Sequence, residues 1–305
     1  MEDRLTNRRM GWIPDWPDFR DFTATSEEVP DRVRRAGRSD SVRGMLRKAG
    51  IGRGRKAALP ASADLRPWCS PVERQGDLGS CTAHAGVGAV EYSERRAFGK
   101  HLDASRLFLY KTTRSLAHLK GDTGAFLRST LGALALFGVP PEEYWPYDTG
   151  KFDREPPAFC YAFAANYQAL TYYRLDEPGL SGTDLLAKVR TNLAAGLAPV
   201  FGFSVYSSLA QAETSGEIPF PTRGERVTGG HAVMAAGYDD ARRIRNASPG
   251  GAETTGALLI RNSWGEEWGD KGYGWLPYEY VTRGIAADWW CLVKCEWVDT
   301  GAFQL

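Results

Sequence analysis

Cys81 stands where a helix is predicted to begin, six residues after Gln75. The residues from Ser80 to about Phe98 carry apolar side chains at helical spacing, and Gly99 follows as a stop signal. A thiol in that place faces unpaired N–H groups and the positive end of the helix dipole, which favour the thiolate. Cys81 is therefore a candidate nucleophile. The alternative is a small residue of the core, because a free cysteine in a helix is often buried.

The same predicted helix contains Gly86 and Gly88. Each glycine lowers helix propensity by about 1 kcal/mol relative to alanine. Their presence predicts that another element packs closely against this face, so we expect the helix to be buried.

Two distant stretches bear on whether Cys81 is reactive. One apolar run begins at His231, and another ends in Asn262. A cysteine nucleophile needs a base within reach, and these stretches offer side chains of the right kind.

Four motifs occur in an order and at separations that resemble those of papain-like cysteine peptidases. They are Gln75, Gly79-Ser80-Cys81, Gly230-His231-Ala232 and Asn262-Ser263-Trp264-Gly265. The resemblance implies that Cys81, paired with His231, attacks an amide carbonyl. It also implies that Asn262 orients the imidazole, and that Gln75 shares an oxyanion hole with the backbone N–H of Cys81.

The resemblance extends from Leu59 to about Val298. Within the family, residues 11–15 and 272–278 are most similar to the bacterial branch that includes xylellain. The same resemblance implies that five residues contact the substrate: Gly124, Ala125, Phe126, Gly230 and Trp264. The first three would contact the substrate backbone and line the second specificity pocket. For the first three, a helix cap with core contacts is the alternative.

Two residues beside the nucleophile depart from the family pattern. Thr82 stands where a tryptophan is usual, and His84 replaces an aromatic residue. A role as a second base is conceivable for His84. A helix residue that packs or bonds to the backbone is the simpler interpretation.

The resemblance implies an α+β fold with a cleft between two lobes. Residues 59–160 would form a mainly helical lobe. Residues 161–305 would form a mainly β lobe, an antiparallel barrel-like sheet with strand character from about Tyr161. The histidine and the asparagine would lie at strand ends and face the helix of Cys81 across the cleft.

Residues 1–58 precede this region and divide by charge. Residues 1–30 carry a net charge of −3, whereas residues 31–56 carry +8. The basic part is rich in Arg, Gly, Ser and Ala, which predicts a mobile linker or a weakly helical segment. No aromatic residues interleave with its charges to stack on bases, so we expect no nucleic-acid partner.

Residues 12–22 differ from the basic part, because aromatic residues alternate with prolines that force an extended backbone. So many large apolar groups should dock on the folded domain. By resemblance, residues 1–58 would be a pro-segment that covers the cleft until the basic linker is cleaved, as in a zymogen. A permanent structural strand on the outer surface is the alternative.

Composition points to an ordinary globular protein, since 43% of the 305 residues are hydrophobic and 25% are charged. No apolar run approaches the ~20 residues of a membrane span. The N-terminus lacks the apolar core of a signal peptide. We expect a cytoplasmic protein with no membrane partner; signal-independent secretion would leave the same pattern.

The cysteines are Cys69, Cys81, Cys160, Cys291 and Cys295. By resemblance, secreted relatives carry a bridge between cysteines at the positions of Leu78 and the loop 121–124, and this chain has neither. We therefore expect free thiols, as in a reducing compartment. No second cysteine pair stands at zinc spacing, so we expect neither a metal nor an organic cofactor.

The sequence thus predicts a cysteine-type peptidase that hydrolyses bonds in a peptide or protein substrate. An acyl transferase that passes the acyl group to an amine would need the same side chains. A catalytically silent peptide-binding protein with this fold is a third alternative, but such a protein would need none of them.

Overall fold

A computed structural model of the chain describes residues 9–35, 39–52, 58–165 and 167–297. Its α-helices are α1 (Asp31–Arg35), α2 (Val42–Lys48), α3 (Cys81–Phe98), α4 (Arg106–Leu116), α5 (Leu127–Leu136), α6 (Ala158–Ala164), α7 (Gly182–Ala194) and α8 (Tyr278–Thr282). Its strands are β1 (Ser62–Asp64), β2 (Tyr167–Arg174), β3 (Val200–Tyr206), β4 (Val227–Arg245), β5 (Glu253–Arg261), β6 (Tyr273–Pro277) and β7 (Ala286–Trp297). None of the helices described is long and apolar enough to cross a membrane.

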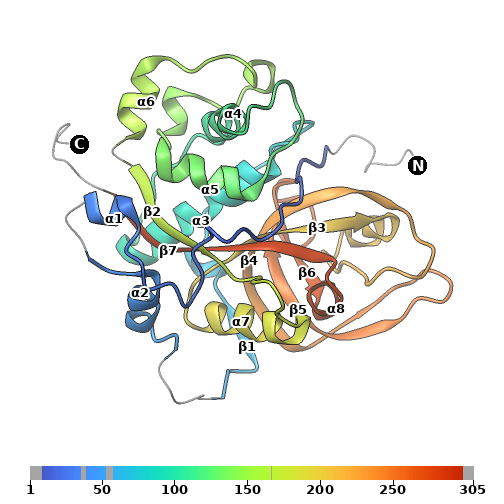
Figure 1. Cartoon of the computed structure of the whole chain (residues 1–305). Helices are drawn as coiled ribbons and strands as arrows, with labels where there is room; N and C mark the ends of the chain where they lie inside the picture. The colour runs from blue at the N-terminus through green and yellow to red at the C-terminus, as the bar shows by residue number, and fades with distance from the viewer. Residues whose placement is uncertain (1–8, 36–38, 53–57, 166, 298–305) are drawn as a thin grey trace.

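The strands form one antiparallel sheet in the order β2-β7-β3-β4-β5-β6, and β1 pairs with β4 (Figure 1). The central strand β4 is apolar and buried on both faces over much of its length, because α3 and α7 also pack against it. The predicted α+β fold with an antiparallel sheet is confirmed. Strand β1 comes from the residue range assigned to the helical lobe, yet it lies in the sheet.

Helix α3 lies between the other helices and the sheet (Figure 1). A Cβ atom at Gly86 would come within 2.9 Å of the Thr130 Cγ2 atom of α5. A Cβ atom at Gly88 would come within 2.6 Å of the Arg261 Nη1 atom of β5. The predicted close packing of this helix is therefore confirmed, with one glycine facing each layer.

One expectation about local structure needs correction. Strand character begins at Tyr167 in β2 and not at about Tyr161, because Tyr161 lies in α6, which buries Cys160, Phe163 and Ala164 on one face at helical spacing. Of the two alternatives for the basic segment, the helical one agrees with the structure, which has α1 and α2 there. Helix α2 begins after the capping hydroxyl of Ser41 and buries three apolar side chains, Val42, Met45 and Leu46.

Residues 9–22, which we call the strap, run in extended conformation between the helices and the sheet (Figure 1). Trp12 is 7% exposed and docks as predicted. Trp16 and Phe19 are 85% and 96% exposed, so the expectation that the aromatic residues dock is wrong for these two. Two carboxylates that flank this pair in the sequence, Asp15 and Asp21, point inward and bind an arginine of α5.

Candidate active site

The thiol of Cys81 lies at the first residue of α3 and is fully buried. The backbone N–H of Ala232 in β4 donates to its Sγ atom over 3.4 Å. Since Ala232 follows His231 directly, this contact brings the helix of the cysteine against the strand of the histidine.

His231 lies inside β4, five residues before that strand's midpoint, and not at a strand end as predicted. Strand β4 continues on both sides of it because β3 pairs with this stretch, with Phe203 opposite His231. The imidazole Nε2 atom lies 2.7 Å from the Asn262 Oδ1 atom. The Trp264 ring stacks on the imidazole, with ring centres 4.6 Å apart, and covers this hydrogen bond from solvent.

Asn262 follows the end of β5, as predicted, and connects to Gln75 through Ser263. The Ser263 N–H donates to Asn262 Oδ1 over 2.8 Å, and the Ser263 hydroxyl donates to Gln75 Oε1 over 2.6 Å. The Ser263 carbonyl accepts from the Gln75 N–H over 2.8 Å. Ser263 lies within a recognised motif, but its role as a connector could not be read from residue type alone.

The side chain of Gln75 is oriented by this arrangement. Because its Oε1 atom accepts from Ser263, its Nε2 atom is the one that can donate elsewhere. It donates to the carbonyls of Leu78, over 2.8 Å, and Arg9, over 2.9 Å. One amide donor beside Cys81 therefore points at the strap.

The strap also takes up backbone groups of the residues predicted to bind substrate. The Ala125 N–H donates to the Gly11 carbonyl over 2.7 Å, and the Ala125 carbonyl accepts from the Ile13 N–H over 3.0 Å. On the other side, the Gly230 carbonyl accepts from the Trp12 N–H over 3.1 Å.

Close backbone approach makes these contacts possible. A Cβ atom at Gly11 would fall 1.8 Å from the Gly79 carbonyl oxygen, and one at Gly124 would fall 2.2 Å from the Gly11 carbonyl oxygen. Phe126 differs from its neighbours, since it is half-buried and serves as the N-cap residue of α5.

Burial raises the pKa of the Cys81 thiol to about 11. The backbone N–H groups of Ala232 and Gly11 lower it only in part. With the strap in place, loss of water on burial therefore opposes the helix end, which favours the thiolate.

His84 lies one turn along α3 and is also buried. Its Nδ1 atom is 3.1 Å from the Ser80 carbonyl oxygen, and its ring meets the Tyr147 ring edge-on. Burial lowers the pKa of His84 to about 3, so the imidazole is neutral. These contacts agree with a residue that packs and bonds to the backbone.

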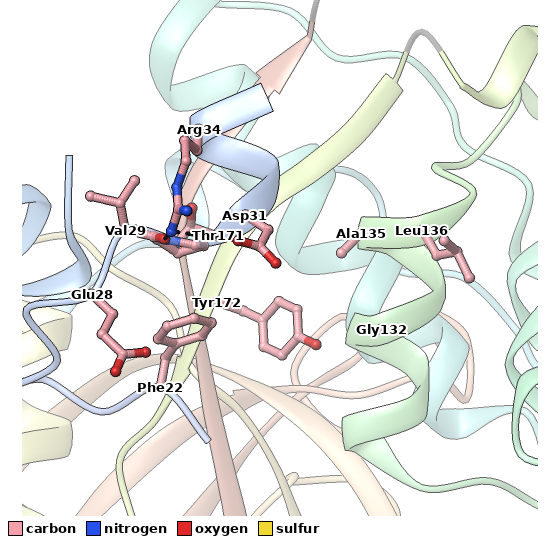
Figure 2. Close-up of a pocket in the computed structure, with 11 residues that line it drawn as sticks. Phe22, Glu28, Val29, Asp31, Arg34, Gly132, Ala135, Leu136, Thr171 and Tyr172 are labelled. Atoms are coloured by element: carbon pink, nitrogen blue, oxygen red, sulfur yellow. Dashed lines mark hydrogen bonds and ion pairs between the residues drawn. The ribbon is translucent and has the colours of Figure 1, made fainter. Parts of the chain in front are cut away.

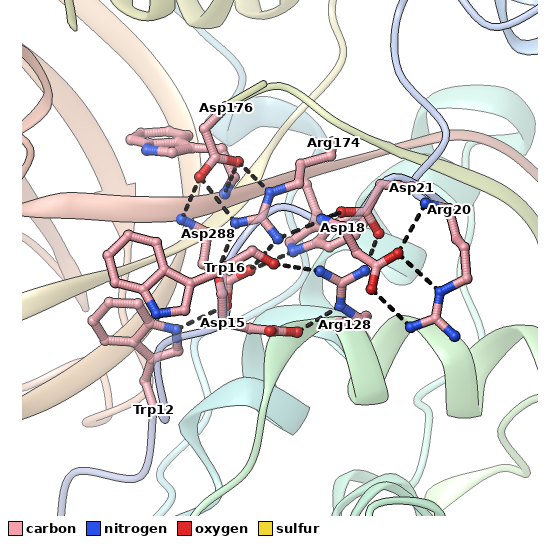
Figure 3. A network of polar contacts seen from close by, with 12 residues as sticks. Trp12, Asp15, Trp16, Asp18, Arg20, Asp21, Arg128, Arg174, Asp176 and Asp288 are labelled. Carbon is pink, nitrogen blue, oxygen red and sulfur yellow. Dashed lines mark hydrogen bonds and ion pairs between the residues drawn. The ribbon is translucent and has the colours of Figure 1, made fainter. Parts of the chain in front are cut away.

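A network of ionic contacts holds the rest of the strap (Figure 3). The Arg128 Nε atom of α5 lies 2.5 Å from Asp15 Oδ2, and a second nitrogen of Arg128 contacts Asp21. Arg174 of β2 donates to the Asp15 carbonyl over 2.8 Å. These contacts lie apart from the residues around Cys81.

A cavity of about 440 Å³ opens where the chain leaves the strap, between Phe22, α1, α5 and β2 (Figure 2). It contains none of the predicted catalytic side chains.

Cys69, Cys81, Cys160 and Cys291 are buried, and none of these four described cysteines forms a disulfide. The side chain of Cys295 lies outside the described residues. Within the part of the chain that the structure describes, no group of His, Cys, Asp and Glu side chains could hold a metal ion.

Comparison with known proteins decides the family. The family model described as papain family cysteine protease matches residues 59–291. The chain belongs to the papain family of cysteine proteases. Over the described residues, its fold of helices against an antiparallel sheet is the papain-like fold.

Relatives of this papain-family chain include proteins that align over nearly its whole length. The crystal structure of xylellain, a cysteine protease from Xylella fastidiosa, matches this chain with a TM-score of 0.69 and 32% sequence identity. The match covers 94% of this chain and 97% of the xylellain chain. The resemblance to the xylellain branch is therefore confirmed. An uncharacterised peptidase C1-like protein of Acanthamoeba polyphaga mimivirus is 29% identical over 303 residues, 96% of this chain and 89% of that protein. Cysteine proteinase 3 of Solanum lycopersicum is 30% identical over 70% of this chain and 55% of its own length.

Proposed function

We propose that this cysteine protease cleaves peptide bonds with Cys81 as nucleophile, His231 as base and Asn262 as the group that orients the imidazole. One observation carries the assignment. The His231 Nε2 atom lies 2.7 Å from Asn262 Oδ1, while the residue after His231 bonds to the Cys81 sulfur. This leaves Nδ1 as the imidazole nitrogen that exchanges the proton with the thiol.

The reaction then has four steps. His231 takes the thiol proton, and the sulfur of Cys81 adds to the scissile carbonyl carbon, whose oxygen becomes negative. The Cys81 N–H and the Gln75 amide donate hydrogen bonds to that oxygen. The imidazolium protonates the leaving amine as the carbon–nitrogen bond breaks. Water, deprotonated by His231, hydrolyses the thioester and restores the thiol.

We also propose that the chain is made as a self-covered zymogen, with the strap as the cover. The Gln75 Nε2 donor that would stabilise the oxyanion is engaged by the Arg9 carbonyl. The N–H and C=O groups of Ala125 that would pair with a substrate backbone are engaged by Gly11 and Ile13. Substrate and strap thus need the same groups, so they exclude each other.

The test compares peptide cleavage by the full chain and by Gly11→Ala, a substitution that should displace the strap. Products are identified by mass, which separates hydrolysis from transfer of the acyl group to an amine. Cys81→Ala in the opened chain should abolish cleavage. Cys160→Ala is the matched control, because that cysteine is also buried and free but lies in α6. Cleavage that survives Cys81→Ala would refute the assignment, and equal rates for the full and opened chains would refute the cover.

A further inference from the structure

His84 shares α3 with Cys81, and its imidazole contacts a backbone carbonyl beside the nucleophile. The His84 Nδ1 atom lies 3.1 Å from the Ser80 carbonyl oxygen. A carbonyl oxygen can only accept, so Nδ1 carries the hydrogen and donates it. Burial lowers the pKa of His84 to about 3, so the ring is neutral and its Nε2 atom carries no hydrogen.

The Nε2 atom of His84 makes this arrangement unfavourable for packing alone. The atom is buried, and it has no hydrogen-bond partner among the described residues. An unpaired acceptor in the interior destabilises a fold. A phenylalanine would fill a similar volume without that loss. What the histidine adds at this position is the donor at Nδ1.

The carbonyl that His84 holds belongs to the peptide unit between Ser80 and Cys81. The N–H of the same unit is the Cys81 N–H, which begins α3 and has no acceptor within the helix. The Ser80 carbonyl also accepts from the His84 backbone N–H over 3.1 Å, so two donors fix the plane of this peptide unit. Hydrogen bonds at a carbonyl also polarise the peptide, which strengthens its N–H as a donor.

The side chain of Ser80 takes part in the same set of contacts. Serine is a preferred N-cap residue because its hydroxyl accepts from an N–H of the first helical turn. Ser80 occupies the N-cap position of α3 but makes no such bond. Its Oγ atom lies 2.6 Å from the Tyr147 hydroxyl and 3.4 Å from His84 Nδ1. The serine therefore links the histidine to the tyrosine.

Tyr147 extends these contacts to the residue of the second oxyanion donor. Its hydroxyl donates to the Gln75 carbonyl over 2.9 Å, so the Ser80 hydroxyl is the donor in the Ser80–Tyr147 bond. Burial raises the pKa of Tyr147, so its hydroxyl keeps the proton. The His84 ring packs edge-on against the Tyr147 ring, with ring centres 5.0 Å apart.

These contacts join the two ends of a short loop, residues 76–80, that separates Gln75 from Cys81. Gly76 in this loop has a φ of 63°. Glycine gives a loop access to several backbone conformations. The separation of the Gln75 amide from the Cys81 N–H would vary with them if the ends of the loop were not joined.

We propose that His84 is a positioning residue for the oxyanion hole, acting through Ser80 and Tyr147 on its two donors. The inference rests on the proposed peptidase function and adds a residue to its machinery. His84 contacts none of the reacting atoms. It keeps the Cys81 N–H and the Gln75 amide where the negative oxygen forms, so that they need no reorganisation during the reaction.

Peptide kinetics in the Gly11→Ala chain test the proposal. His84→Phe keeps a ring and removes the donor, so kcat should fall about tenfold with KM unchanged, because the oxyanion forms only in the transition state. His84→Asn should restore most of kcat, since its side-chain amide offers an N–H near the position of Nδ1. Alkylation of Cys81 by iodoacetamide forms no oxyanion, so its rate should be the same in every variant. His101→Phe is the matched control, because this half-buried histidine lies in the loop after α3.

Three outcomes would overturn the positioning role of His84. They are an unchanged kcat in His84→Phe, alkylation that slows together with kcat, and no recovery of kcat in His84→Asn. A Gly11→Ala chain that cleaves no peptide would refute the peptidase assignment, and the positioning role with it.

A second measurement needs no substrate and so separates the hydrogen bond of His84 from the peptidase assignment. Nitrogen NMR of the full chain distinguishes ring nitrogens that carry a hydrogen from those that carry none. The signals of His84 are identified by their loss in His84→Asn. We expect a hydrogen on Nδ1 and none on Nε2 at pH 7, since the pKa of His84 is about 3. A hydrogen on Nε2 alone would overturn the proposal, because Nδ1 could then not donate to the Ser80 carbonyl.

Discussion

Gly11→Ala should open the strap without changing any residue of the proposed catalytic set. The added Cβ atom would lie 1.8 Å from the Gly79 carbonyl oxygen and 2.3 Å from its carbon. These are backbone atoms, so the strap must move by more than 1 Å, as a tolerable contact needs about 3 Å. That movement breaks the Gly11–Ala125 hydrogen bond of 2.7 Å and loosens the Trp12–Gly230 bond of 3.1 Å.

The free energy follows from these losses. Overpacking costs about 1–3 kcal/mol, and each lost hydrogen bond costs about 0.5–1.5 kcal/mol. We take about 2–4 kcal/mol as the destabilisation of the closed strap. At 1.4 kcal/mol per factor of ten, the open fraction should rise by about 30- to 1000-fold.

The assay is the rate at which iodoacetamide modifies Cys81 at pH 8, followed by intact mass with Cys81→Ala as the blank. Gly44→Ala is the matched control, because it places the same methyl group in the extension with only the Ser41 hydroxyl nearby, at 3.4 Å. We expect fast labelling for Gly11→Ala and an unchanged rate for Gly44→Ala. Equal rates for both variants, with unchanged circular dichroism, would show that the strap does not limit access to the thiol.

Four further predictions follow from the same contacts. In the Gly11→Ala background, Gln75→Ala should lower kcat by about 100-fold, since one oxyanion donor is lost. The rate of cleavage of a peptide substrate at saturating concentration measures this loss. Ser263→Ala should lower kcat by a smaller factor, about tenfold, because Gln75 keeps its amide but loses the hydroxyl that orients it. An equal loss of kcat in Gln75→Ala and Ser263→Ala would contradict this ranking. The pKa of Cys81 is raised to about 11 in the closed chain, so the contribution of this thiol to the stability of the closed strap is complete below pH 9 and is lost as pH rises through 11. The pH profile of Cys81 alkylation should therefore shift to lower pH in Gly11→Ala. Identical profiles for the two proteins would refute this. Burial raises the pKa of Glu94 to about 8, so the contribution of this carboxyl to the free energy of unfolding is lost as pH rises from about 4.5 to 8. Glu94→Gln keeps an acceptor for the Leu102 N–H. In calorimetry it should raise Tm at pH 8.5 by at least about 3 °C and give no gain at pH 4.

Much of the candidate site could be predicted because short motifs record local geometry. The cysteine at the start of a helix is read from apolar spacing and a stop at Gly99, and α3 has these bounds. Asn262 follows an apolar run, which is β5. His231 was expected at a strand end because it begins an apolar run, but β4 already begins at Val227 and includes the two glycines before it. Of these, Gly230 leaves room for the strap.

What could not be predicted depends on contacts between distant residues. Asp288 lies in an apolar stretch near the end of the chain, and only the pairing of β7 with β3 brings it to Trp12. The pKa of Cys81 was predicted from the helix end alone, whereas burial of the thiol has the largest effect on it. Strand character was expected from about Tyr161, six residues before β2 begins, although the buried residues of α6 repeat at helical spacing.

In the proposed cover, the strap competes with the substrate for the same backbone groups. Substrate offers the same hydrogen bonds, so contacts at Ala125 and Gly230 cannot by themselves favour the strap. Tethering helps, because a linked segment acts at an effective concentration that free peptide seldom reaches. The ion pair of Asp15 with Arg128 and the hydrogen bond from Arg174 to the Asp15 carbonyl add affinity outside the shared groups, where no substrate contact is needed. In the proposed cover, the residues up to Ile13 would block the groups that bind substrate, and the residues after Ile13 would set how tightly the strap is held.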